Sequence, residues 1–169
     1  IFQTKIMQMQ FPKILSPPFL IWVICPSSFF LRKVCPVLYL LFLQTITGIP
    51  KPEALEVFDA FEFAIQFSEK LYDYPFWLQD LSHLPLFFIF TWLAHWFFVT
   101  DFQDIKLNYK ALIVSLFYAV FNEGIQAFIP DRFPSPGDLF MNLAGVATAF
   151  FIYKKIHKKI SLPNAGAKT

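Results

Sequence analysis

The sequence predicts an all-α membrane protein, a polytopic helical bundle of about four transmembrane helices with one additional amphipathic helix. Of the 169 residues, 56% are hydrophobic and only 15% are charged, whereas charged residues make up about 25% of an average soluble domain. The chain contains 24 Phe and 4 Trp, which is more apolar surface than a soluble domain of this size can bury. We therefore expect one compact bundle in a lipid bilayer, without a second domain.

Residues 1–31 are an N-terminal extension whose structure the sequence leaves open. The segment 14–31 is apolar, but it contains three prolines, which disrupt a helix interior: Pro17, Pro18 and Pro26. Three structures fit this pattern: a fifth span, a re-entrant or interfacial segment, or a signal-like stretch. The membrane domain is expected to cover 32–153.

Four apolar segments are predicted to cross the membrane: 34–49, 81–99, 111–129 and 138–153. Pro36 lies in the first turn of the first segment, where proline is tolerated. Asp80 precedes the second segment and Asp138 begins the fourth, and each is expected to cap its helix. A short proline-rich loop, 130–137, joins the last two segments, so these helices should be antiparallel neighbours.

The segment 53–73 is predicted to be an amphipathic helix. Its apolar residues recur at the spacing of a helix with one apolar face: Leu55, Phe58, Phe61, Ile65 and Leu71. Its acidic residues argue against crossing the membrane: Glu56, Asp59, Glu62 and Glu69. We expect this helix to lie at the membrane interface or to cap the bundle. Aromatic residues in 74–77 are expected at the membrane surface.

The distribution of basic residues predicts the orientation. With four spans, three basic groups fall on one side of the membrane: Arg32 with Lys33, Lys106 with Lys110, and the lysines of the tail 154–169. Basic residues beside spans favour the cytoplasm, so the C-terminal tail is expected to be cytoplasmic and Arg132 to face outward. The tail lysines lack the aromatic or glycine pattern of a nucleic-acid site, and no nucleic-acid partner is expected.

The cysteines and histidines do not suggest a metal or cofactor site. Cys25 and Cys35 are each followed by proline and lack metal-ligand spacing. His83 and His95 differ by about 120° around a helix axis and should not share a ligand. We expect neither a metal nor a cofactor.

Polar residues in the last two apolar segments are the candidate functional residues. Glu123 and Gln126 lie on one face of their helix, and Asp138 and Asn142 lie on one face of the next. Ionisable groups inside a membrane are costly and suggest a function. Because the two helices are neighbours, we expect these side chains to meet near the outer surface, with Arg132 of the connecting loop above them.

Asp80 and His83, at the outer end of the second span, are expected to complete this site. The residues also have purely structural interpretations: a helix cap for Asp138, interhelical contacts for Gln126 and Asn142, and an ion pair between Glu123 and Arg132. Both interpretations stay open at the level of the sequence.

The spacing of these residues resembles the VanZ-like family of bacterial membrane proteins. The elements E-x-x-Q, a basic residue in a Pro/Ser loop, and D-x-x-x-N-x-x-G occur here as Glu123–Gln126, Arg132 and Asp138–Asn142–Gly145. Asp80–His83 resembles the family's D-K-x-x-H-F element. Leu81 and Leu84 replace its lysine and its aromatic residue, which weakens the expectation for His83. The resemblance covers roughly 33–153.

The resemblance implies a bacterial membrane protein of about four spans, in a family whose named member is associated with low-level resistance to the glycopeptide teicoplanin. We expect a multi-pass protein of the bacterial inner membrane that binds an anionic headgroup or a cell-wall precursor at an outward-facing site. The expected ligand-binding residues are Asp80, His83, Glu123, Gln126, Arg132, Asp138 and Asn142. Arg132 would contact the anion, because a guanidinium suits phosphate and carboxylate groups.

The alternative is a membrane-embedded hydrolase or transferase that acts on a lipid-linked substrate. Asp80, His83 and Glu123 would then supply acid–base chemistry. No nucleophile motif supports an enzyme, so no catalytic residue is assigned. The absence of an internal repeat argues against an independent transporter. The oligomeric state stays open.

Overall fold

The computed structural model describes residues 17–99 and 108–161. Within these residues the chain is helical and contains no strand, and its elements are α1 Pro17–Ile24, the π-helical turn η2 Phe30–Val34, α2 Cys35–Gly48, α3 Pro52–Val57, α4 Glu62–Tyr72, α5 Phe76–Phe98, α6 Tyr109–Gln126 and α7 Pro136–Ser161. This confirms the predicted all-α fold. Predictions for 1–16, for Lys106 in 100–107 and for 162–169 fall outside the described residues.

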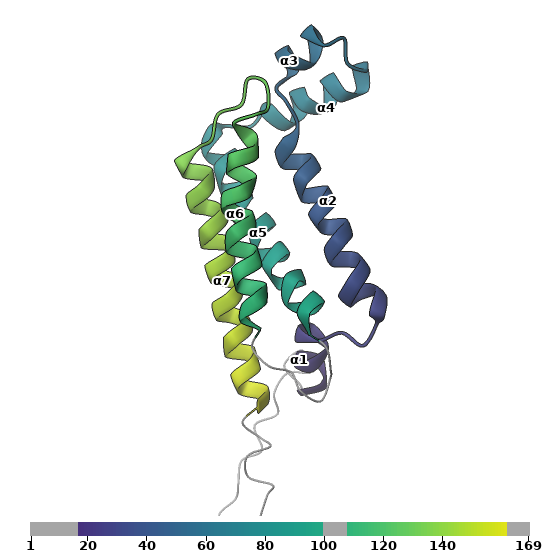
Figure 1. The fold of residues 1–169 in the computed structure, drawn as a ribbon, viewed down its shortest axis with the longest axis vertical. Helices are drawn as coiled ribbons and strands as arrows, with labels where there is room; N and C mark the ends of the chain where they lie inside the picture. Colours follow the sequence, from purple (N-terminus) through teal and green to yellow (C-terminus); the bar gives the residue numbers. More distant parts are fainter. Residues whose placement is uncertain (1–16, 100–107, 162–169) are drawn as a thin grey trace, which may run out of the picture.

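Four helices, α2, α5, α6 and α7, run along the long axis of the molecule (Figure 1). Helix α5 packs most extensively against α7 and also contacts α6 and α2. The core between them is formed by large apolar side chains: Leu43, Phe87, Phe90, Tyr118 and Val146. Helices α3 and α4 project from one end of the bundle, and α1 lies at the other end (Figure 1).

Three of the described helices are long and apolar enough to cross a membrane: Phe30–Gly48, Phe76–Phe98 and Pro136–Ile160. Helix α6 has 18 residues and is not one of them. It carries three buried polar side chains near its end: Asn122, Glu123 and Gln126. Neighbouring helices shield these groups, as polar groups at membrane depth require. Helix α1 has 8 residues, or about 12 Å, which is much shorter than the ~30 Å hydrocarbon core.

Two helix starts differ from the prediction in ways that shape the site. Helix α5 begins at Phe76 with Pro75 as its N-cap residue, so Asp80 lies within the helix and does not cap it. The start of α7 is capped by Ser135, whose Oγ accepts the Asp138 N–H at 3.4 Å. Asp138 therefore lies in the first turn of α7 and is free to point toward other helices.

The segment predicted as one amphipathic helix, 53–73, consists of α3 and α4. Helix α3 ends at Val57, and Asp59, two residues beyond this end, has a φ of +51°. The Asp59 N–H donates to Glu56 O and the Ala60 N–H donates to Leu55 O, both at 3.0 Å. These two hydrogen bonds are those of a Schellman motif, which terminates a helix. Glycine usually occupies the left-handed position, and aspartate is among the few other residues that tolerate it.

Candidate functional site

A buried chain of hydrogen bonds joins three of the predicted site residues across three helices. Asn142 Nδ2 of α7 donates to Glu123 Oε1 of α6 over 2.9 Å, and Asn142 Oδ1 lies 2.9 Å from His83 Nδ1 of α5. Glu123 is only 5% exposed, and Asn142 is fully buried. Because the amide nitrogen faces a carboxylate, the amide oxygen faces the imidazole, so His83 donates through its Nδ1–H. Glu123 thus fixes the orientation of the His83 ring through Asn142.

Two aspartates lie on the other side of the His83 ring. The Nε2 atom of His83 is 3.7 Å from Asp138 Oδ1, and the carboxyl groups of Asp138 and Asp80 are within hydrogen-bonding reach of each other. A side chain at Gly137 would place its Cβ only 2.7 Å from Asp80 Oδ2. A residue without a side chain is therefore needed at Gly137 for Asp80 to approach the start of α7.

The N-terminus of α7 provides electrostatic compensation for these carboxyl groups. The Ser135 N–H lies 3.4 Å from Glu123 Oε2, and Ser135 Oγ accepts the Gly137 N–H at 3.2 Å. Backbone N–H groups at the start of a helix carry partial positive charge, which favours nearby carboxylates. Asp80, Glu123 and Asp138 all gather at this helix end, so the cost of burying them is reduced within the protein itself.

The remaining predicted residues, Gln126 and Arg132, contact the end of α2. Arg132 Nη1 donates to Thr47 O at 2.7 Å and to Ile49 O at 3.4 Å, and Gln126 Nε2 donates to Thr47 O at 3.4 Å. A cation at a helix C-terminus is favourable, because carbonyl groups there lack intrahelical partners. The guanidinium also lies 5.6 Å from the ring centre of Tyr72. Burial raises the pKa of Tyr72, and the charge of Arg132 opposes that rise.

Arg132 therefore belongs to a different group of contacts from the carboxylates. Among the described residues, its side chain forms no ion pair with Glu123 or Asp138. The turn before it has Pro130 followed by Asp131 at φ +59°, and the Arg132 N–H donates to Ile129 O at 3.1 Å. These are the features of a type II turn. The turn leaves the guanidinium on the side of the loop that faces α2.

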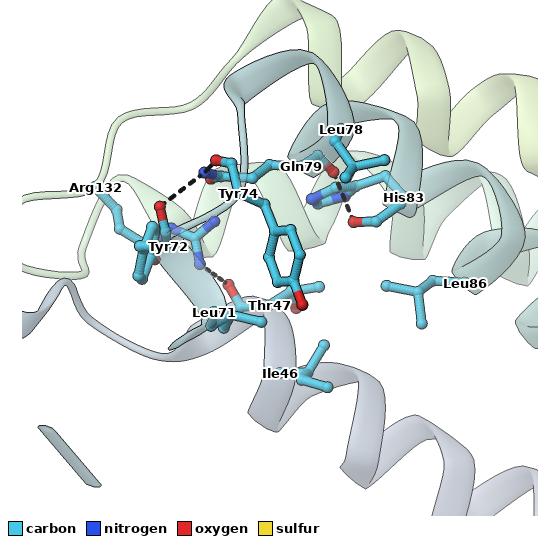
Figure 2. A pocket seen from close by; sticks show the side chains of 11 residues that line it. Ile46, Thr47, Leu71, Tyr72, Tyr74, Leu78, Gln79, His83, Leu86 and Arg132 are labelled. Carbon is cyan, nitrogen blue, oxygen red and sulfur yellow. Dashed lines mark hydrogen bonds between the residues drawn. The ribbon is translucent and has the colours of Figure 1, made fainter. Parts of the chain in front are cut away.

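A pocket of about 290 Å³ lies between α2, α4 and α5, and its wall includes Arg132 from one group of contacts and His83 from the other (Figure 2). Arg132 lies on one side of the pocket and His83 on the other in this view. The rest of the lining combines apolar side chains with hydroxyl and amide groups, including Ile46, Leu71, Leu78, Leu86, Tyr74 and Ser82. Among the residues that the structure describes, no carboxylate lines this pocket. The predicted residues Asp80, Glu123, Gln126, Asp138 and Asn142 do not line it either.

Within the described part of the chain, no three His, Cys, Asp or Glu side chains are grouped as a metal site would require. His83 and His95 have separate environments. The Nδ1 atom of His95 lies 2.8 Å from Thr91 O, and the centre of its ring lies 4.1 Å from that of the tilted Tyr153 ring.

Comparison with known protein families identifies the domain. A family model described as VanZ/LLP1 matches residues 20–158. The chain belongs to the VanZ/LLP1 family. The matched region contains the whole hydrogen-bonded network and the pocket, and it begins within α1. The comparisons with curated proteins and with solved structures found no match.

Three contributors to the site of this VanZ/LLP1 protein were not predicted from the sequence: Thr47, Tyr72 and Ser135. Ser135 precedes Pro136 and lies three residues before Asp138. This spacing is typical of a helix start, so the cap could have been predicted from the sequence. Thr47 contributes chiefly a backbone carbonyl to Arg132 and Gln126, and a backbone group leaves no trace in the sequence. Tyr72 contacts Arg132 only because α4 folds back over the end of α2.

Proposed function

We propose that this protein binds the anionic headgroup of a membrane-embedded ligand in the pocket beside Arg132. The main support is the chemistry of the lining, which among the described residues includes a guanidinium and an imidazole but no carboxylate. Such a lining favours an anion such as a phosphate. A membrane lipid and a lipid-linked cell-wall precursor share this chemistry.

The guanidinium has donors left for a ligand. Within the described residues, Nη1 of Arg132 donates to the carbonyl groups of Thr47 and Ile49, and a guanidinium carries five N–H donors in all. Those two contacts and the Tyr72 ring hold the side chain in one position, so little conformational entropy is lost when an anion binds. The apolar part of the pocket, formed by Ile46, Leu71, Leu78 and Leu86, suits the remainder of a lipid.

The carboxylates have an indirect role in this proposal. Asp138 lies beside His83 Nε2, and Glu123 orients the ring through Asn142. The network behind the pocket would therefore hold the His83 ring in one orientation at the pocket wall, and the acidic groups need not touch the ligand.

The alternative function, a hydrolase or transferase, has less support. A general acid or base must reach the substrate with its titrating atom. Both nitrogens of His83 face protein groups, Asn142 on one side and Asp138 on the other. Membership of the VanZ/LLP1 family leads us to place the protein in the bacterial inner membrane. An effect on teicoplanin susceptibility would follow if the ligand is a cell-wall precursor.

Binding measurements on the purified protein in detergent test this proposal. We expect Arg132→Gln to weaken binding of short-chain phosphatidylglycerol or of undecaprenyl diphosphate by about tenfold, or ~1.4 kcal/mol, because a charge-assisted hydrogen bond is lost. The phospholipid and the cell-wall carrier distinguish the two sources of the headgroup, and phosphatidylcholine serves as the ligand without net charge. Arg132→Lys, which keeps the charge, should lose less.

Lys155→Gln is the matched control, since it also removes one positive charge but at an exposed position near the end of α7. Equal losses for Arg132→Gln and Lys155→Gln would show a non-specific charge effect and would overturn the proposal. So would tight binding of phosphatidylcholine by the unmodified protein.

A further inference from the structure

The hairpin formed by α3 and α4 projects from one end of the bundle (Figure 1) and exposes a group of large apolar side chains. The pocket lies at the same end, because α4 contributes to its wall. We call this group the hairpin patch: Val57, Phe58, Phe61, Phe63 and Phe67. Phe61 is 90% exposed and Phe63 is 80% exposed. The rings of Phe63 and Phe67 stack 6.4 Å apart. A patch of this kind is unusual on a surface that faces only water.

The two faces of α4 explain how the patch arises. One face packs against the bundle: Ser68 Oγ donates to Pro50 O at 2.8 Å and Tyr72 Oη donates to Ile49 O at 2.9 Å. The other exposed residues of α4 divide into two stripes. Phe63 and Phe67 form the apolar stripe, and the polar stripe contains Glu62, Gln66 and Glu69. A helix with this distribution suits a boundary between water and lipid.

The chain connections place the hairpin at the level of that boundary. Helix α3 starts at Pro52, shortly after α2 ends at Gly48, and α4 ends at Tyr72, shortly before α5 starts at Phe76. Both α2 and α5 belong to segments long and apolar enough to cross a membrane. The hairpin therefore cannot move far from the point where these helices leave the bilayer.

We propose that the hairpin patch is embedded in the headgroup and acyl boundary of the leaflet next to the pocket. The hairpin then acts as an interfacial anchor, with its apolar stripe toward lipid and its acidic stripe toward water. Attraction to anionic lipid contributes little, because the charges of α4 are mostly acidic. Insertion is consequently insensitive to the anionic lipid content and to salt.

The anchor has a consequence for the pocket, and this step rests on the function proposed above. Leu71 and Tyr72 of α4 form part of the pocket wall. If α4 lies in the interface, this wall lies at headgroup depth. The ligand then enters from the bilayer and not from bulk water, which favours a lipid or a lipid-linked molecule over a soluble anion.

Fluorescence quenching in vesicles tests the depth of α4. The environment-sensitive fluorophore NBD is attached to a cysteine at Phe67→Cys or, as the matched control, at Glu69→Cys. These positions lie about 160° apart on the same helix. Cys35→Ala removes the competing thiol, and Cys25 is fully buried.

The probe at position 67 should be quenched roughly threefold more than the probe at position 69 by lipids with a nitroxide near the headgroup, because interfacial helices insert ~5–10 Å. The probe at position 69 should be quenched more by iodide in the water.

The same pattern is expected in phosphatidylcholine vesicles with and without phosphatidylglycerol. Equal access of both probes to iodide, with no quenching by the lipid nitroxide, would overturn the proposal. Probes shielded from both quenchers would indicate a second copy or another protein over the patch and would also overturn it. Phe61→Cys, at the most exposed position, provides a second variant if labelling at position 67 disturbs folding. The quenching measurement needs no ligand. It can therefore contradict the interfacial position of the hairpin without affecting the binding prediction for Arg132, and a failed binding prediction leaves the position of the hairpin unaffected.

Discussion

Asn142 is the residue on which the buried polar network depends. Its amide is the only link between Glu123 and His83 within the described residues, and it satisfies both of them at 2.9 Å. Thr47 plays a comparable role on α2, where its hydroxyl lies 2.7 Å from Asn122 Oδ1. Asn142 joins three helices and Thr47 joins two, so the network contributes to packing as well as to the orientation of His83 beside the pocket.

We predict that Asn142→Leu destabilises the protein by about 2–4 kcal/mol, because it keeps the side-chain size but leaves a buried carboxylate and a buried imidazole without their partner. The measurement is thermal or denaturant unfolding in detergent. Thr148→Val, on the same helix, is the control. The Thr148 hydroxyl is exposed and bonds only to Ala144 O of its own helix, so its loss should cost under about 0.5 kcal/mol. Similar unfolding midpoints for both variants would contradict this role of Asn142.

At the scale of helices, α5 and α7 are in close backbone contact at Gly145. A Cβ atom there would lie 2.4 Å from Leu84 O and 3.0 Å from Phe88 N, both backbone atoms of α5. Small residues allow helices in membranes to pack closely. This contact fixes the spacing between α5, which carries His83, and α7, which carries Asn142.

We therefore predict opposite effects for two glycine substitutions. Gly145→Ala forces α5 and α7 apart, because backbone atoms cannot move aside, and should cost about 2 kcal/mol or more. Gly124→Ala, in the exposed interior of α6, meets nothing within 4 Å and should be neutral or stabilise the protein by up to about 1 kcal/mol. Unfolding midpoints and the yield of membrane-inserted protein measure both effects. A neutral Gly145→Ala variant would show that the helices can separate at little cost.

Prediction from the sequence succeeded where a common local pattern decides the structure. It failed at one unusual helix end and where contacts between distant residues decide the structure. Apolar length located the long helices, and helical spacing placed Glu123 and Asn142 on facing helices. The break at Asp59 was missed because aspartate seldom takes the position that glycine usually fills at a helix end. The partners of Arg132 were also missed. They are backbone carbonyls 83 and 85 residues away in the sequence, and no pattern of side chains reveals them.

At the scale of the whole molecule, the described residues include two basic clusters at one end of the long axis and an acidic hairpin at the other. Arg32 and Lys33 lie at the start of the α2 segment, and Lys154 and Lys155 lie near the end of α7. Figure 1 shows these two helix ends at the same end of the bundle, opposite the α3–α4 hairpin. Among the described residues, the acidic hairpin and the pocket therefore lie at one end, and the two basic clusters at the start of the α2 segment and the end of α7 lie at the other. Basic residues beside spans favour the cytoplasm, so we expect the pocket to face outward.

Labelling of intact bacterial cells with a membrane-impermeant maleimide tests this orientation. In the Cys35→Ala background, Phe128→Cys introduces a thiol at the pocket end, where Phe128 is 88% exposed. Lys155→Cys introduces a thiol at the opposite end of the bundle, where Lys155 is also exposed. We expect the thiol at 128 to be labelled in intact cells and the thiol at 155 only after the membrane is permeabilised. The reverse pattern would place the pocket on the cytoplasmic side of the membrane. The available anion would then be a headgroup of the cytoplasmic leaflet, and a drug that acts outside the cell could not compete with the protein for it.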